Sequence, residues 1–253
     1  MPTEGNMALQ RLDKIVASTG RYTRSEAAAL IRKGGVTVNG TRARSGAEKA
    51  DPETDEILAE GVRAGGPEKR WFMLNKPAGV LSATEDARGE TVLDLLPPEL
   101  RRIGLHPAGR LDKDSEGLLI LTNDGDWTHR VISPRKDVWK EYLVETEGVL
   151  TEEDRAAVEA GIVLKDFTCR PGRMKILGAG ETGRALVWIR EGKYRQVRRM
   201  LASLGKPVTS LRRLAVGGLR LDPDLAPGAF RELTEEEAMT AFAAGDPEKD
   251  GKS

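Results

Sequence analysis

The sequence is poor in the residues on which several classes of site depend. Its 253 residues include one cysteine, two histidines and 4% aromatic side chains. Cys169 therefore has no partner for an internal disulfide, and no Cys or His residues stand at the spacing of zinc ligands. We expect Cys169 to be a small packing residue and the protein to need no metal.

Long apolar runs are also missing. No stretch approaches the roughly 18 apolar residues of a membrane-spanning helix, and the opening residues MPTEGNMALQRLDK lack the apolar core of a secretory signal. The sequence therefore predicts a cytoplasmic protein with no membrane partner.

Net charge is absent too, with 40 basic and 40 acidic residues, but the two signs are unevenly distributed. Residues 8–49 hold nine basic and three acidic side chains, and residues 190–200 hold five and one. Acidic residues are concentrated at 51–60 and 234–250 instead. A local excess of basic residues is typical of a face that binds a polyanion, although two solvated basic helices would give the same pattern.

The basic N-terminal segment predicts a compact unit. Apolar residues at helical spacing over LQRLDKIVAS stop at Gly20, and TRSEAAALIRKG begins a second helix with Thr23 or Ser25 as its cap. GVTVNGTRA alternates like a strand into an Asn-Gly turn. The pattern over residues 8–58 resembles the alpha-L RNA-binding domain shared by a small-subunit ribosomal protein and several RNA-modifying enzymes. The resemblance implies phosphate contacts, for which we expect Arg11, Lys14, Arg24 and Lys33.

The rest of the chain predicts a second, larger domain. A linker at 59–69, rich in small residues, Gly and Pro, precedes alternating strand-like and helical runs over residues 70–243, and residues 244–253 form a polar tail. The alternation predicts an α+β fold with a mixed sheet. No Gly-rich phosphate loop joins a strand to a helix, so we expect no nucleotide cofactor.

The segment AGRLDKDSEGLLILTNDG, residues 108–125, has Asp112 and Asp114 just before an apolar strand. A calcium loop fits the first acids but fails at Asn123, where a bidentate carboxylate is required. A paired-carboxylate hydrolase stays conceivable, because alternate residues of an extended segment face one side, but the few aromatics argue against a sugar-binding cleft. In a third interpretation, Asp112 simply caps the turn into the strand.

Six blocks occur in the order found in a known family. They are FMLNKPAGV (72–80), HPAGRLDKDSEGLLILTNDG (106–125), WTHRVISPR (127–135), KEYLV (140–144), EGKYRQVRRML (191–201) and LRRLAVGGLRL (211–221). Together with the N-terminal pattern, they resemble the RsuA-like family of RNA pseudouridine synthases. The resemblance covers about residues 8–240 and implies a largely antiparallel sheet flanked by helices.

The resemblance also implies roles for four residues. Asp112 is the catalytic carboxylate, either as the nucleophile at ribose C1′ or as the base that removes the C2′ proton. Arg198 pairs with Asp112 through a bidentate guanidinium and lowers its pKa. Tyr142 stacks on the target base, and Arg110 helps hold the flipped-out nucleotide.

Other residues of the blocks are expected to be architectural. Lys76 and Pro77 belong to a block that we expect to pack rather than react. His106 and His129 have no orienting carboxylate in the pattern, so we expect a structural role for His106 and at most an RNA contact for His129.

HPAGRLD and WTHRVISPR resemble the small-subunit members of the family more than the large-subunit members. We therefore expect a monomer that isomerises one uridine of 16S ribosomal RNA, free or in a pre-ribosomal particle, without a cofactor or metal. The alternatives are a large-subunit RNA target and a non-catalytic RNA-binding factor of ribosome assembly.

Overall fold

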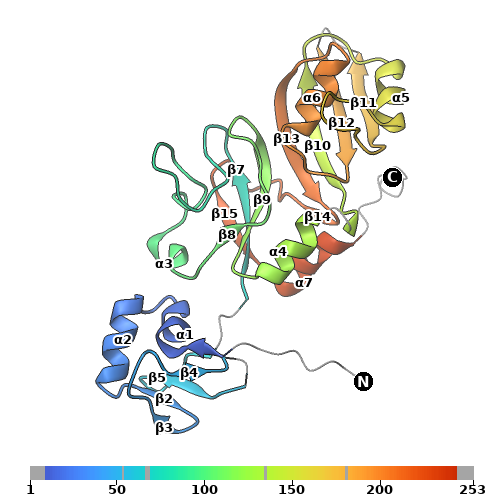
Figure 1. Cartoon of the computed structure of the whole chain (residues 1–253). Helices are drawn as coiled ribbons and strands as arrows, with labels where there is room; N and C mark the ends of the chain where they lie inside the picture. The colour runs from blue at the N-terminus through green and yellow to red at the C-terminus, as the bar shows by residue number, and fades with distance from the viewer. Residues whose placement is uncertain (1–8, 53, 66–68, 134–135, 180–181, 244–253) are drawn as a thin grey trace, which may run out of the picture. The chain divides into compact units, whose positions relative to one another are not determined.

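The computed structural model describes most of the chain as two compact units (Figure 1). The residues described are 9–52, 54–65, 69–133, 136–179 and 182–243. The first unit consists of residues up to Lys69 together with Leu96–Leu105, and the second of Arg70–Leu95 and the chain from His106 onward. The segment Leu96–Leu105 thus groups with the first unit, although the sequence pattern assigned it to the catalytic domain. The predicted polar tail, 244–253, lies outside the described residues.

The first unit is built from three short helices and two small sheets. Its elements are β1 (Gln10–Arg11), α1 (Leu12–Ser18), α2 (Arg24–Arg32), β2 (Val36–Val38), β3 (Thr41–Arg42), β4 (Lys49–Ala50), β5 (Ile57–Ala59), β6 (Val62–Arg63) and α3 (Pro98–Arg101). One sheet has the strand order β3-β2-β5-β6, and the other pairs β1 with β4. Strands β5 and β6 extend this unit into the segment predicted as a linker.

Local sequence signals account for these boundaries. The Thr23 hydroxyl accepts a bond from the Glu26 amide at 3.3 Å, and the Glu26 carboxylate accepts one from the Thr23 amide at 2.6 Å, so a capping box begins α2. Asn39 and Gly40 have φ values of 50° and 76°, as the tight β2–β3 turn requires. Of the two predicted caps, Thr23 and Ser25, the structure has Thr23, and the predicted Asn-Gly turn is confirmed.

The apolar residues between these elements form the core of the first unit. Its buried members are Leu12, Ile15, Val16, Ala27, Ile31, Val36, Ala43, Ala50, Ile57, Ala59 and Ala64. They come from helices α1 and α2, from the strands and from the loops between them. Burial of this shared apolar surface stabilises elements that are too short to be stable alone.

The second unit is a larger sheet with helices. Its elements are β7 (Trp71–Lys76), β8 (His106–Pro107), β9 (Glu116–Thr122), α4 (Gly125–Ile132), β10 (Lys140–Thr146), α5 (Glu152–Ala160), β11 (Arg173–Ala179), β12 (Gly183–Ile189), α6 (Gln196–Ser203), β13 (Val208–Val216), β14 (Leu219–Arg220), β15 (Phe230–Leu233), α7 (Glu235–Met239) and the 3-10 helix η2 (Thr240–Phe242).

The main strand order is β11-β12-β10-β13-β9-β7-β15, with β14 added beside β13 and β8 beside β9. Among the described strand pairs, β9 and β13 run parallel and the others antiparallel. The predicted α+β fold with a mixed, largely antiparallel sheet is confirmed. The central pairings of β10 and β13 bring Tyr142 beside Arg213 and Lys140 beside Val216.

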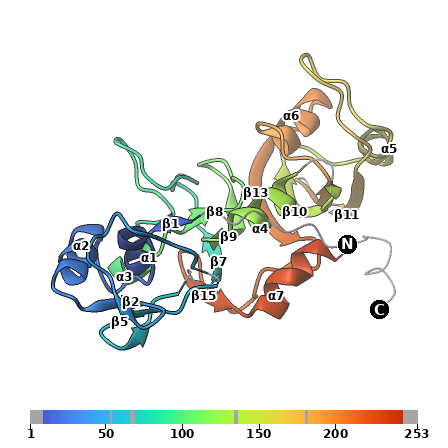
Figure 2. The ribbon, with the colours of Figure 1, turned by 60° about the horizontal axis from the view of Figure 1, so that its bottom comes forward.

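Helices α4 and α7 lie near β7, β9 and β15, whereas α5 and α6 lie beside the strands β10 to β13 (Figures 1 and 2). Trp127 of α4 and Ala238 of α7 share a buried cluster with Met73 of β7 and Ile120 of β9. This packing fixes the strand β9 and hence the loop that precedes it. None of the described helices is long and apolar enough to cross a membrane.

Candidate active site

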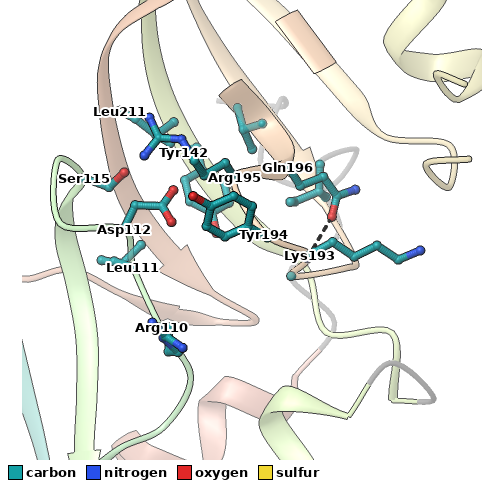
Figure 3. Close-up of a pocket in the computed structure, with 13 residues that line it drawn as sticks. Arg110, Leu111, Asp112, Ser115, Tyr142, Lys193, Tyr194, Arg195, Gln196 and Leu211 are labelled. Atoms are coloured by element: carbon teal, nitrogen blue, oxygen red, sulfur yellow. Dashed lines mark hydrogen bonds between the residues drawn. The ribbon is translucent and has the colours of Figure 1, made fainter. Parts of the chain in front are cut away.

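A cavity of about 250 Å³ opens in the second unit where four of the sequence blocks meet. The loop before β9 supplies one wall, strands β10 and β13 supply Tyr142 and Leu211, and the segment from Gly192 to the first turn of α6 supplies the opposite wall. Asp112, on the loop, points toward the tyrosine side chains across the cavity (Figure 3). Arg110, Asp112 and Tyr142 are therefore brought together, as predicted for a single site.

A buried cation holds the loop that carries Asp112. Lys76, at the end of β7, is fully buried, and its Nζ donates to the carbonyls of Pro77, Asp112, Lys113 and Ser115 at 2.8 to 3.4 Å. Burial lowers the pKa of Lys76 to about 8. Lys76, which we expected only to pack, thus fixes the backbone of the loop that carries Asp112.

Neutral hydrogen bonds hold the same loop from its other side. The Ser82 hydroxyl donates a hydrogen bond to the Leu111 carbonyl at 2.8 Å and accepts one from the Leu111 amide at 3.1 Å. The Gly79 amide donates to the carbonyl of Lys113 at 2.7 Å, and the Ser115 amide to that of Asp112 at 3.0 Å. With its backbone bonded on both sides of Asp112, the loop offers a preorganised position for one side chain.

The Asp112 carboxylate itself is half-buried and makes no hydrogen bond or ion pair with any other described residue. It is also the only carboxylate among the described residues that line this cavity. A backbone that is held while its carboxylate stays unengaged suits a group that must react with a ligand. This arrangement does not match the calcium loop or the two-carboxylate hydrolase considered from the sequence.

The neighbouring carboxylate, Asp114, is engaged instead. Arg195 donates to both of its oxygens at 3.2 and 2.8 Å, and Arg198 Nη2 lies 3.5 Å from one of them. The hydrogen bond from Arg195 lowers the pKa of Asp114, and the charge of Arg198 adds to this effect. Asp114 therefore orders the basic segment rather than reacting.

The predicted pair between Arg198 and Asp112 is not present in the structure. Arg198 donates to the carbonyl of Val208 at 3.0 Å and to the backbone carbonyl of Asp114 at 2.9 Å. These two fixed acceptors, on β13 and on the loop, hold the guanidinium away from Asp112. Arg198 is absent from the lining of the cavity, whereas Arg195, which the sequence reasoning passed over, contributes to it.

Two tyrosines face the cavity with different exposure. Tyr142 is buried in β10, whereas Tyr194 is 76% exposed, and both line the cavity (Figure 3). An exposed aromatic ring at the rim of a cavity can cover a planar base that enters from solvent. The sequence reasoning singled out Tyr142 and missed Tyr194, although the block EGKYRQVRRML contains it.

The four basic residues predicted to contact RNA in the first unit are all exposed. Arg11 donates to Asp13 at 2.6 Å and Arg24 lies 3.4 Å from the same carboxylate. The buried Asp13 thus holds two guanidinium groups close together, while Lys14 and Lys33 have no ion pair among the described residues. Their contact with RNA stays a prediction.

The histidines and the cysteine lie away from this cavity's lining. His106 Nε2 is 3.0 Å from the Thr128 hydroxyl, in agreement with a structural role, and His129 is exposed on α4.

Cys169 is a buried free thiol whose pKa is raised by burial, as expected for a packing residue. Across the part of the chain that the structure describes, no group of three or more His, Cys, Asp or Glu side chains is arranged to hold a metal.

Comparison with known proteins matches both units. Residues 70–203 match the family model described as RNA pseudouridylate synthase, and residues 10–57 match the S4 domain. The chain is 44% identical to the uncharacterized RNA pseudouridine synthase YtzG of Bacillus subtilis (strain 168), over 90% of this chain and 96% of that protein.

One further relative and one solved structure point to the same family. The chain is 40% identical to the ribosomal small subunit pseudouridine synthase A of Escherichia coli (strain K12), over 90% of this chain and 97% of that protein. A solved structure described as a pseudouridylate synthase superposes with a TM-score of 0.65 at 36% identity, covering 92% of this chain and all of that one. With an S4 domain, the matching catalytic domain and relatives at this identity over nearly the whole chain, the protein belongs to the RsuA-like family of RNA pseudouridine synthases.

Proposed function

We propose that this protein converts one uridine of 16S ribosomal RNA into pseudouridine in the cytoplasm, acting as a monomer with Asp112 as its single catalytic carboxylate. The observation that carries the proposal is the unengaged Asp112 carboxylate on a loop whose backbone is held by Lys76 and Ser82. The small-subunit target is supported by the 40% identity to a relative named for that subunit.

The reaction needs few groups. The bond between uracil N1 and ribose C1′ breaks, the uracil turns, and C5 bonds to C1′ while the C5 proton is lost and N1 regains one, so no redox change occurs. Asp112 acts either by adding to C1′ as N1 leaves or by removing the C2′ proton. Either role requires a carboxylate in a partly closed cavity, and the half-buried position of Asp112 meets that requirement.

The remaining cavity residues position the substrate. Tyr142 and Tyr194 supply aromatic surfaces for a base taken out of its stack. Arg110 is exposed on the loop beside Asp112, where a guanidinium can contact the backbone of the extruded nucleotide. Arg198 acts through Asp114 and the backbone contacts described above, as a positioning residue for the loop and α6.

The test is an isomerisation assay on prefolded 16S and 23S ribosomal RNA fragments, with the product mapped to a single nucleotide. We expect pseudouridine at one position of the 16S RNA. Pseudouridine found only in the 23S RNA would mean that the target is the large-subunit RNA. Binding without pseudouridine in either RNA would favour a non-catalytic assembly factor. Chelation of metal in the presence of prefolded RNA should leave the rate unchanged.

A further inference from the structure

A second cavity, of about 530 Å³, adjoins the one that contains Asp112. The two share Arg110, Tyr142, Gly192 and Lys193 as lining residues. The two cavities are therefore neighbours, and Tyr142 lies in the lining of both. This cavity has no part in the isomerisation as derived above.

Two buried cations line this second cavity. Lys140 is 9% exposed and Arg213 is 5% exposed. Lys140 and Tyr142 are two residues apart in β10, so their side chains lie on the same face of the sheet, and Arg213 pairs with Tyr142 across β13. The strand register thus directs both cations to the cavity beside the base site.

Neither cation is fully satisfied by the protein. The Lys140 ammonium makes no hydrogen bond or ion pair with any other described residue. Arg213 donates from Nε to the carbonyl of Leu118 at 2.8 Å, but its Nη2 is buried without a partner. A charge that is mostly removed from water and has unused hydrogen-bond donors costs free energy, and an anionic ligand in the cavity would supply the missing acceptors.

The other charged residues of the cavity leave this excess of positive charge in place. Glu191 is the one carboxylate among the described lining residues, and its Oε2 already accepts from the Arg170 amide at 3.0 Å and from Gln196 Nε2 at 2.9 Å. Burial and the charge of Arg213 lower the pKa of Lys140 to about 8, and Asp137 raises it by less. Arg110 and Lys193 add two more positive charges to the lining.

We propose that the cavity lined by Lys140 and Arg213 binds a phosphodiester of the substrate RNA next to the target uridine. The proposal rests on RNA being the substrate, and not on which RNA is modified. A phosphate is the charged group that RNA carries at every nucleotide, and its non-bridging oxygens match an ammonium and an open guanidinium N–H. Because Tyr142 lines both cavities, its position links the phosphate contact to the placement of the base.

The protein arm of the test compares Lys140→Met with Lys175→Met. Methionine keeps the chain length and removes the charge, and Lys175 is an exposed lysine of the same sheet. We expect Lys140→Met to reduce the slope of log Kd against log salt concentration by roughly one unit, the value for one lost phosphate contact. The slope of Lys175→Met should stay unchanged. Equal slopes in both variants and the unsubstituted protein would overturn the proposal.

The RNA arm changes the substrate, so its first measurement uses the unsubstituted protein and does not depend on the folding of a variant. Single neutral methylphosphonate linkages are placed on the 5′ or the 3′ side of the mapped uridine. We expect one of the two to weaken binding to the unsubstituted protein at least fivefold and to have no further effect on binding to Lys140→Met. Equal penalties in both proteins would contradict the assignment of Lys140 to that phosphate.

Two other outcomes separate this proposal from its alternatives. The salt slope of Kd could be reduced in Lys140→Met while the unsubstituted protein isomerises neither ribosomal RNA. That result would overturn the proposed function and still support the phosphate site. Inorganic phosphate that raises the melting temperature only when Lys140 is present, with unchanged RNA slopes, would assign the cavity to a free anion and overturn the RNA assignment.

Discussion

The two units of this protein use positive charge in opposite ways. In the first unit, the predicted RNA contacts Arg11, Lys14, Arg24 and Lys33 are exposed on the surface. In the second, Lys76, Lys140 and Arg213 are nearly or fully buried. Exposed cations attract a polyanion over a distance, depend strongly on salt and cost the fold little. Buried cations cost the fold much more, and each is held in one place.

This contrast teaches that a net charge of zero says little about RNA binding. In general, exposed cations give a protein affinity for a polyanion that does not depend on exact position, whereas a buried cation acts at one atom. Lys76 acts on protein carbonyls, and Lys140 has no described protein acceptor at all. The two buried lysines therefore differ: Lys76 holds the loop that carries Asp112, and Lys140 is available to a ligand.

Among the charged residues around Asp112, the largest effect is expected from Lys76→Met. The substitution leaves three carbonyls of the loop that carries Asp112, and the carbonyl of Pro77, without their buried donor, so Asp112 loses its fixed position. We expect the single-turnover rate to fall at least a hundredfold and the free energy of unfolding to fall by roughly 2 to 4 kcal/mol. RNA affinity should change less than threefold.

Lys113→Met is the matched control, because Lys113 is an exposed lysine of the same loop. Its rate should stay within about twofold of the unsubstituted protein. Full activity in Lys76→Met, measured on protein shown by circular dichroism to be folded, would mean that the buried cation does not position the loop.

A smaller loss is expected from Asp114→Asn. The change removes the charge that holds Arg195 and Arg198, but exposed ion pairs contribute little, and the backbone contact of Arg198 remains. We expect the rate to fall by about tenfold or less. Asp166→Asn, which removes an exposed carboxylate from Arg199 on the same helix, should have no effect on the rate.

Lys140→Met should make the protein more stable while it weakens RNA binding. The pKa of Lys140 is about 8 in the folded protein, below its ordinary 10.5, so the unfolded chain binds more protons between these values. The cost of the buried charge is therefore fully present below pH 8 and disappears as the pH rises toward 10.5. We expect a gain of roughly 1 to 3 kcal/mol at pH 7.

Urea unfolding at pH 7 and pH 10 measures this difference. The stability gap between Lys140→Met and the unsubstituted protein should be largest at pH 7 and smaller at pH 10. Lys175→Met should match the unsubstituted protein at both values. A Lys140→Met variant that is less stable at pH 7 would place the ammonium in a favourable protein contact and remove the contrast with Lys76.

The smallest effect for each residue is expected in the first unit. Replacing Lys14 and Lys33 with Ala should reduce the salt slope by roughly one unit or less per lost contact. Replacing Arg11 and Arg24 should reduce it by less, because Asp13 already neutralises part of their charge. Chemistry on bound RNA should hardly change. Equal slopes for both double variants and the unsubstituted protein would mean that these residues are only solvated.

Much of the fold followed from local chemistry and from family resemblance. The Thr23 cap and the Asn39–Gly40 turn depend on residues within three positions, so the sequence alone predicted them. The sheet architecture and the meeting of Asp112 with Tyr142 followed from the resemblance, since strands distant in sequence cannot be paired from local pattern alone.

The site's electrostatics could not be predicted in the same way. Arg195 and Arg198 both form ion pairs with Asp114, and which carboxylate of the loop these arginines reach depends on the register of α6 against that loop. Lys140 looks like a polar strand end in KEYLV, and only the pairing with β13 shows that it is buried beside Arg213. Such contacts need the tertiary structure.

The central claim is that Asp112 reacts and the residues around it position the substrate. Its most direct test is single-turnover isomerisation of the mapped, prefolded RNA by Asp112→Asn, with RNA affinity measured on the same preparation. The account predicts product at background while Kd stays within roughly tenfold, about 1.4 kcal/mol, of the unsubstituted protein. Measurable turnover by Asp112→Asn, or an equal loss of turnover in Asp114→Asn, would contradict it.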